Sequence, residues 1–225
     1  RVVSSIVRFG ATNLKPGVVR QDFEGDWLIG RPFWANDNKV KEICEELAPA
    51  FKVTAVENIT AMKWLQLIVE TSFCIPALLG KSISEAFADS AMAQLGVLFL
   101  KEGFAALEDA RIKLESQPDL SLEDLKQLIA LPLREAGEKF SEIMSRLPQQ
   151  TKEASVVKRM NQDYLEEIDY INEELIRLAR FGRTGCVLNV KAVNLVKEFK
   201  KTGKFLSPAE VAKAYKRELG LDENA

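Results

Sequence analysis

The stretch from Asn58 to Gly80, NITAMKWLQLIVETSFCIPALLG, is the feature that most limits the fold, because it reads as a helix that is apolar on almost every side. A helix without a polar face belongs in the interior of a domain, with other helices packed around it. We therefore expect a mainly helical domain built around this segment.

Three residues of this segment, four positions apart, are less apolar than the residues around them. They are Gln66, Glu70 and Cys74, and on a continuous helix this spacing places them in one row. A buried carboxylate such as Glu70 needs a partner, or a pocket that holds water or ligand, because an uncompensated buried charge is costly. We interpret the row as the wall of a binding site. A polar seam satisfied by neighbouring helices would explain the same pattern.

The composition excludes several classes of chemistry. The 225 residues include no histidine, and Cys44, Cys74 and Cys186 stand at unrelated spacings. Ser-His-Asp and Cys-His catalysis and most transition-metal sites are therefore excluded, and we expect no metal. The cysteine pattern fits a reducing, cytoplasmic compartment. A net charge of -2 gives no general attraction to nucleic acid, and the charge-free run from Ser90 to Leu100 is too short to span a membrane.

The first 57 residues differ from everything after them. We expect strands within residues 2–11, 18–22 and 26–30, a helix that begins near Asn36 to Asn38, and a short strand from Phe51 to Val56. Lys15-Pro16-Gly17 supplies a turn, because proline presets φ at one position and glycine tolerates positive φ at the next. The strand–helix–strand order indicates the end of an α/β domain at residues 1–57. Since the chain also starts on strand-like residues, we expect a fragment of a longer protein.

From residue 58 to residue 225 the pattern is helical throughout. Within the long segment from Ser84 to Leu114, Gly96 and Gly103 are seven residues apart. Seven residues are nearly two helical turns, so both glycines share a face that could let another helix approach closely.

Three segments resemble those of the ketopantoate reductases (2-dehydropantoate 2-reductases). YLEEIDYINEELIRLAR, Tyr164 to Arg180, is similar to that family's TEIDYINGEVVRLGR run. ITAMKWLQLIVETSFCIPALLG is similar to its W-x-K-L-x-x-N-x-x-x-N-P helix, and FGATNLKPGVVRQDFEGDWLIG to the hairpin that ends its nucleotide-binding domain. The resemblance runs in order from about Arg1 to Lys201.

The resemblance implies both a fold and an activity. The fold would be a helical, bundle-like domain of the kind that ends 6-phosphogluconate dehydrogenase, at residues 58–225, preceded by the last strands and helix of a Rossmann-type α/β domain. The activity would be NADPH-dependent reduction of a 2-keto acid to a 2-hydroxy acid, namely ketopantoate to pantoate in pantothenate biosynthesis. The Gly-rich phosphate loop that holds NADP in such enzymes is absent from this chain, so its cofactor-binding residues are unknown.

Carried over residue by residue, the family's site is matched only in part. Glu167 matches the active-site glutamate, and Ser155 matches a serine that contacts substrate. The catalytic lysine falls on Gln66, and two substrate-binding asparagines fall on Glu70 and Cys74. Glutamine can donate a hydrogen bond but cannot supply the proton that a lysine would give to the ketone oxygen. Glu70 would repel a substrate carboxylate.

We therefore predict a ketopantoate-reductase-like protein that has lost the usual reaction or acts on a different carbonyl compound, neutral or cationic. Lys63, about 60° round the helix from Gln66, is a candidate replacement acid. The alternative is an inactive helical module for ligand binding or dimerisation, with the segment from Ala86 to Leu107 as the interface of a homodimer.

A third interpretation starts from the basic stretch from Arg177 to Lys204, which holds eight Lys or Arg residues and only Glu198 as an acid. Such a stretch could attract phosphate or nucleic acid. A solvated helical face explains it equally simply, and we expect neither nucleic acid nor membrane as a partner.

Overall fold

The computed structural model describes residues 2–147 and 154–221, with side chains from residue 161 onward in the second range. The chain divides into two compact units, Arg1–Leu65 and Gln66–Ala225. The division falls inside helix α2 (Ile59–Glu70), whereas the boundary expected from the sequence lies just before this helix.

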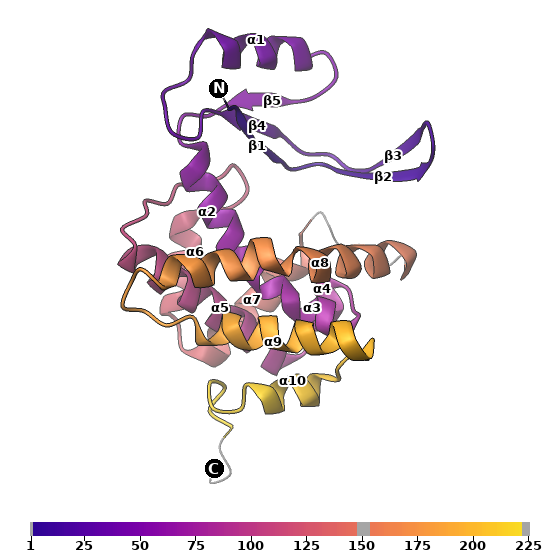
Figure 1. Cartoon of the computed structure of the whole chain (residues 1–225), viewed down its shortest axis with the longest axis vertical. Helices are drawn as coiled ribbons and strands as arrows, with labels where there is room; N and C mark the ends of the chain where they lie inside the picture. Colours follow the sequence, from indigo (N-terminus) through magenta and orange to yellow (C-terminus); the bar gives the residue numbers. More distant parts are fainter. Residues whose placement is uncertain (1, 148–153, 222–225) are drawn as a thin grey trace. The chain divides into compact units, whose positions relative to one another are not determined.

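The first unit contains a three-stranded sheet with the strand order β1 (Ser4–Val7), β4 (Trp27–Gly30), β5 (Val53–Ala55) (Figure 1). β1 is antiparallel to β4, and β5 is parallel to β4. Helix α1 (Asn38–Leu47) connects the two parallel strands, and the side chain of Asp37 caps its first turn. A parallel pair joined through a helix is a βαβ unit, so the expected strand–helix–strand order is confirmed.

A separate hairpin is inserted between β1 and β4. Its strands are β2 (Gly10–Lys15) and β3 (Val18–Phe23), paired antiparallel. Pro16 and Gly17 form the two-residue turn, and Gly17 has a φ of 78°. Positive φ at the second central position is what a type II turn requires, so the turn predicted from Lys15-Pro16-Gly17 is confirmed.

The first half of α2 belongs to the core of the first unit. Ile59 and Met62 from α2 pack with Ile6 of β1 and Leu28 of β4, and Val56 covers them. Thr60 Oγ1 donates to the carbonyl of Pro32, which ties the helix to the loop after β4. These contacts hold the start of α2 against the sheet.

The second unit is helical. It continues α2 through the short 3-10 helix η1 (Thr71–Phe73), and its described residues form the further α-helices α3 (Cys74–Leu79), α4 (Ile83–Phe87), α5 (Ser90–Asp109), α6 (Leu122–Ala130), α7 (Leu133–Ser145), α8 (Ala154–Ala179), α9 (Val187–Thr202) and α10 (Pro208–Ala214). α8 and α9 lie side by side, and α5 packs against α7 (Figure 1). The mainly helical class is confirmed. The closer likeness to the end of 6-phosphogluconate dehydrogenase stays a prediction.

The prediction of one uninterrupted helix from Asn58 to Gly80 is wrong. α2 ends at Glu70, and a 3-10 turn separates it from α3. The hydroxyls of Thr71 and Ser72 donate to the carbonyls of Ile68 and Val69, both at 2.8 Å, and Pro76 has no N–H to continue the helical ladder. Local hydroxyl bonds and a proline both favour such a break. Cys74 therefore begins a new helix, so Gln66, Glu70 and Cys74 do not share one continuous α-helix.

By length and composition alone, the segments Ile59–Leu79 and Ser90–Asp109 are long and apolar enough to cross a membrane. Interior helices of globular proteins meet the same criteria. In these segments 67% and 56% of the tested window is buried inside the protein. Both segments therefore lie largely in the interior of the protein.

The two glycines of α5 allow close packing, as their spacing predicted. A Cβ atom on Gly96 would lie 2.4 Å from Cε1 of Phe140 in α7, and a Cβ atom on Gly103 would lie 2.8 Å from the side chain of Ile68 in α2. Both glycine faces are thus covered within the chain. The close approach that these glycines allow is therefore to α7 and α2 of the same chain, and a homodimer through the segment from Ala86 to Leu107 stays a prediction.

Candidate functional site

Gln66 and Glu70 occupy the last turn of α2, and both side chains are half-buried. Gln66 Nε2 donates to Glu70 Oε1 at 2.7 Å. Residues four apart on a helix face each other, so this contact follows from the spacing seen in the sequence. A hydrogen bond to a carboxylate is stronger than one between neutral groups, and the pair forms a joined polar surface.

A second glutamine completes this surface. Nε2 of Gln117 lies 3.4 Å from Oε1 of Gln66 and donates to it. Gln117 belongs to the loop between α5 and α6, and only 6% of it is exposed. No local pattern in the sequence points from residue 117 to a helix fifty residues earlier.

Tyr164 of α8 touches the same end of α2 from another side. Its hydroxyl lies 2.8 Å from the carbonyl oxygen of Glu70. Burial raises the pKa of the Tyr164 hydroxyl well above its usual value, and the negative charges of Glu70 and Glu167 add to the effect. Glu70 and Glu167 therefore both lie within electrostatic reach of one hydroxyl group.

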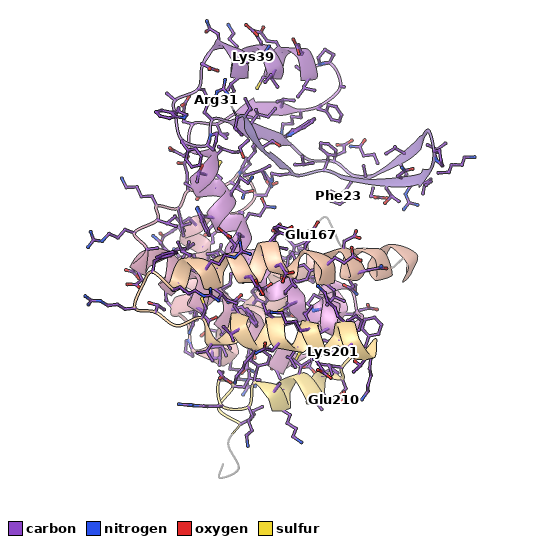
Figure 2. All side chains as sticks on the ribbon, in the orientation of Figure 1. Phe23, Arg31, Lys39, Glu167, Lys201 and Glu210 are labelled. Carbon is purple, nitrogen blue, oxygen red and sulfur yellow. The ribbon has the colours of Figure 1, made fainter. Side chains whose placement is uncertain are left out.

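Glu167 lies on an exposed side of α8, where it is labelled in Figure 2. Its carboxylate has no ion pair or hydrogen bond among the residues that the structure describes. α8 thus brings Glu167, which matches the active-site glutamate of the ketopantoate reductases, near the end of α2. Its role as a catalytic residue stays a prediction.

The other sequence-predicted residues are placed differently. Cys74 is 1% exposed, and burial raises the pKa of its thiol far above the usual range. Its assignment as a substrate-binding residue stays a prediction. The backbone of Ser155 belongs to α8, while its side chain lies outside the described part of the chain. Lys63 is exposed in the first unit and donates to Ser4 Oγ at 3.1 Å.

A buried polar network runs behind this site. The Tyr164 hydroxyl lies 2.7 Å from Oδ1 of Asn172, and Nδ2 of Asn172 donates to the Thr71 carbonyl at 2.9 Å and to Oδ1 of Asn189 at 2.8 Å. Nδ2 of Asn189 in turn donates to Glu102 of α5 at 2.8 Å. The network links η1, α8, α9 and α5. It explains Asn172, the asparagine of the EIDYIN run, as a buried structural connector.

A cavity of about 980 Å³ lies in the first unit, among the residues that follow β4 and precede β1. Its lining includes Arg31, Phe33, Trp34 and Lys39. The Arg31 guanidinium is already engaged, by the carboxylate of Asp37 at 2.8 Å and by the Val2 carbonyl at 2.8 Å. None of the sequence-predicted site residues lines this cavity.

The basic stretch from Arg177 to Lys204 is largely neutralised by acids. Its ion pairs join Arg177 to Glu174, Lys191 to Glu218, Lys197 to Glu173, Lys201 to Glu198, and Lys204 to Glu210. Alternating charges of this kind are typical of solvated helical faces. The pairing favours that explanation over a nucleic-acid surface.

Searches of the sequence against protein-family models and against curated proteins found no match. Solved structures do match. A ketopantoate reductase of the PanE/ApbA family from Ralstonia eutropha JMP134 aligns with a TM-score of 0.65 and 16% identity over 89% of this chain and 59% of its own. A 2-dehydropantoate 2-reductase from Methylococcus capsulatus aligns with a TM-score of 0.62 and 16% identity, over 91% of this chain and 65% of its own.

D-mandelate dehydrogenase in complex with NADH is also similar, with a TM-score of 0.63 and 14% identity over 89% of this chain and 62% of its own. The chain thus spans about three fifths of the length of these structures. Its own helices and strands, over about nine tenths of its length, have the fold of the ketopantoate reductases.

Proposed function

We propose that this chain is the substrate-binding part of an NADP-dependent oxidoreductase of the ketopantoate-reductase type, and that it acts on a carbonyl compound other than ketopantoate. The observation that carries the proposal is the hydrogen bond between Gln66 and Glu70. It stands on the central helix of a ketopantoate-reductase fold, at the two positions where the resemblance expects lysine and asparagine.

The chemistry of carbonyl reduction sets the consequence. A hydride delivered to the carbonyl carbon leaves negative charge on the oxygen, which must receive a proton or be stabilised by donors. The amide of Gln66 can donate a hydrogen bond to that oxygen but holds no acidic proton, so the alkoxide takes its proton from water. Glu70 places a carboxylate beside the same spot, and this charge disfavours an anionic 2-keto acid such as ketopantoate. A neutral or cationic carbonyl compound fits this pair better.

Two observations support NADP as the cofactor. They are the sequence resemblance to the ketopantoate reductases and the structural similarity to a dehydrogenase in complex with NADH. A bound nicotinamide cofactor would supply the hydride. The chain's own residues would bind and orient the carbonyl compound, with Gln66 as hydrogen-bond donor, Glu70 as the charge that selects against carboxylates, and Glu167 at the margin of the site.

The test is an NADPH oxidation assay on the protein expressed from the natural reading frame that contains this chain. Ketopantoate should give no turnover above background. A double variant with Gln66→Lys and Glu70→Asn, which restores the charges that the resemblance expects, should gain turnover of ketopantoate by about a hundredfold or more, the usual contribution of a general acid.

A matched control is available on α6, where Gln127 Nε2 lies 3.3 Å from Glu123 Oε1 across the same four-residue spacing. The double variant Glu123→Asn with Gln127→Lys should leave the turnover of ketopantoate unchanged. If the unmodified protein reduces ketopantoate as fast as the double variant, the proposal is wrong. If neither ketopantoate nor any neutral or cationic carbonyl compound is reduced, the alternative of a module without catalysis holds.

A further inference from the structure

The amide group of Gln66 has only one orientation that suits both of its neighbours. Its nitrogen faces the Glu70 carboxylate at 2.7 Å, and its oxygen faces the Gln117 nitrogen at 3.4 Å. A rotation of the amide by 180° would set oxygen against the carboxylate and nitrogen against the N–H group of Gln117. Both contacts would become repulsive, because a carboxylate only accepts hydrogen bonds and an N–H group only donates them.

Gln117 is suited to hold this orientation because its own backbone is fixed. Its N–H donates to the Leu120 carbonyl at 3.0 Å, and its carbonyl accepts from the Leu120 N–H at 3.1 Å. These two bonds close a tight loop around Pro118, and the Gln117 side chain is buried. Because the backbone is fixed and the side chain is buried, Gln117 loses little additional conformational entropy when it hydrogen-bonds to Gln66.

An amide nitrogen carries two N–H donors. One of those on Gln66 is used by Glu70, and the other has no partner among the residues that the structure describes. With the oxygen directed to Gln117, the group that Gln66 offers to a ligand is a donor. The acceptor that matches it is an oxygen such as that of an aldehyde or ketone.

We propose that Gln117 is a positioning residue, which fixes the Gln66 amide so that its second N–H binds the carbonyl oxygen of an uncharged ligand. This inference rests on the proposed function, since it names the group that holds the carbonyl compound there. Gln117 acts through Gln66 and does not itself touch the ligand.

The test uses the ¹⁵N-labelled chain and hydroxyacetone, a small neutral ketone, followed by NMR. In the unmodified chain, hydroxyacetone should shift the side-chain amide signal of Gln66 in a saturable manner, which yields a Kd. Gln117→Met keeps the length of the side chain but removes the donor. It should raise this Kd about five- to tenfold, the usual effect of losing one hydrogen bond.

Gln117→Glu places an acceptor against the Gln66 oxygen and should raise the Kd further. Gln127→Met, on the exposed face of α6, should leave it unchanged. Denaturant unfolding of each variant separates the two roles, since a purely structural Gln117 would lower stability without changing the Kd of the folded chain or the two proton shifts of the Gln66 amide.

Two different failures can be told apart. If hydroxyacetone shifts the Gln66 signal equally in the unmodified chain and in Gln117→Met, the positioning role is wrong and the proposed function stands. If hydroxyacetone leaves the Gln66 signal unmoved in the unmodified chain, no carbonyl site exists at Gln66, and both proposals are wrong.

Discussion

Asn172 Nδ2 donates a hydrogen bond of 2.9 Å to the carbonyl of Thr71, at the point where α2 gives way to a 3-10 turn. Asn172 is completely buried, and its side chain also bonds to Tyr164 and Asn189. One amide therefore satisfies groups on three separate segments. This explains why the end of α2, with Glu70, keeps a fixed place beside α8.

Replacement of Asn172 by alanine should lower the free energy of unfolding by about 2–4 kcal/mol, because it leaves several buried polar groups without a partner. Urea denaturation of the two chains measures the difference. Asn194→Ala on the exposed side of α9 is the control and should stay within about 0.5 kcal/mol of the unmodified chain. Equal effects of the two substitutions would show that the buried network adds nothing to stability.

Glu102 of α5 caps the N-terminus of α9. Its two carboxylate oxygens accept from the backbone N–H groups of Leu188 and Asn189, at 2.9 and 3.0 Å. Glu102→Gln keeps the shape but leaves one oxygen and no charge at a helix start, where negative charge is favourable. We expect a loss of about 1–2 kcal/mol in the free energy of unfolding.

The control for this substitution is Glu108→Gln, which removes the same charge from an exposed position on the same helix. Hydrogen exchange of the first α9 amides provides a local measurement. Those of Leu188 and Asn189 should exchange faster in Glu102→Gln, while amides in the middle of α9 should change less. Unchanged exchange at residues 188 and 189 would rule out capping by Glu102.

Local chemistry made much of the fold predictable. Pro16-Gly17 specifies its turn through φ preferences alone, and the apolar period from Ile168 to Leu178 specifies a helix with one buried face. The row formed by Gln66 and Glu70 is likewise local, since four residues separate them. Each of these features depends on residues that are near one another in the chain.

The features that sequence reasoning missed depend on distant partners. Nothing in the local pattern around Gln117 shows that it will meet Gln66, because the contact is made only when the loop after α5 folds back onto α2. The break after Glu70 was missed because the apolar pattern continues through it. There, hydroxyl bonds from Thr71 and Ser72 and the packing of α8 prevail over helix periodicity.

Gly96 should not tolerate a methyl group. The added carbon would lie 2.4 Å from the ring of Phe140, which is itself held at 5.0 Å from the ring of Phe87. Gly96→Ala should therefore cost about 1–3 kcal/mol through overpacking, in spite of the better helix propensity of alanine. Gly185→Ala, whose added carbon would meet only Val187 at 3.8 Å, should change stability by less than about 0.5 kcal/mol. A Gly96→Ala chain as stable as the original would mean that α5 and α7 are packed less closely than described.

The three cysteines should react with a thiol reagent at very different rates. Burial raises the pKa of the Cys186 thiol to about 12, with a further contribution from the charge of Glu102, and raises that of Cys74 still more. Cys44 is only half-buried. Because the thiolate is the reactive form, a disulfide reagent at pH 8 should label Cys44 first and reach Cys74 and Cys186 only as the protein unfolds.

The same shift has a consequence for stability at high pH. A thiol whose pKa is raised from 9.0 to about 12 by folding keeps its proton in the folded state while the unfolded chain loses it. The resulting stabilisation is complete below pH 9 and is lost as the pH rises from 9 toward 12. Cys186→Ala should make the decline of unfolding free energy over this interval shallower, with the part due to Cys74 remaining, whereas Cys44→Ala should change it less. If both substitutions reduce the decline equally, or if Cys186 is labelled as fast as Cys44 in the folded protein, the Cys186 thiol is not buried beside Leu175 of α8.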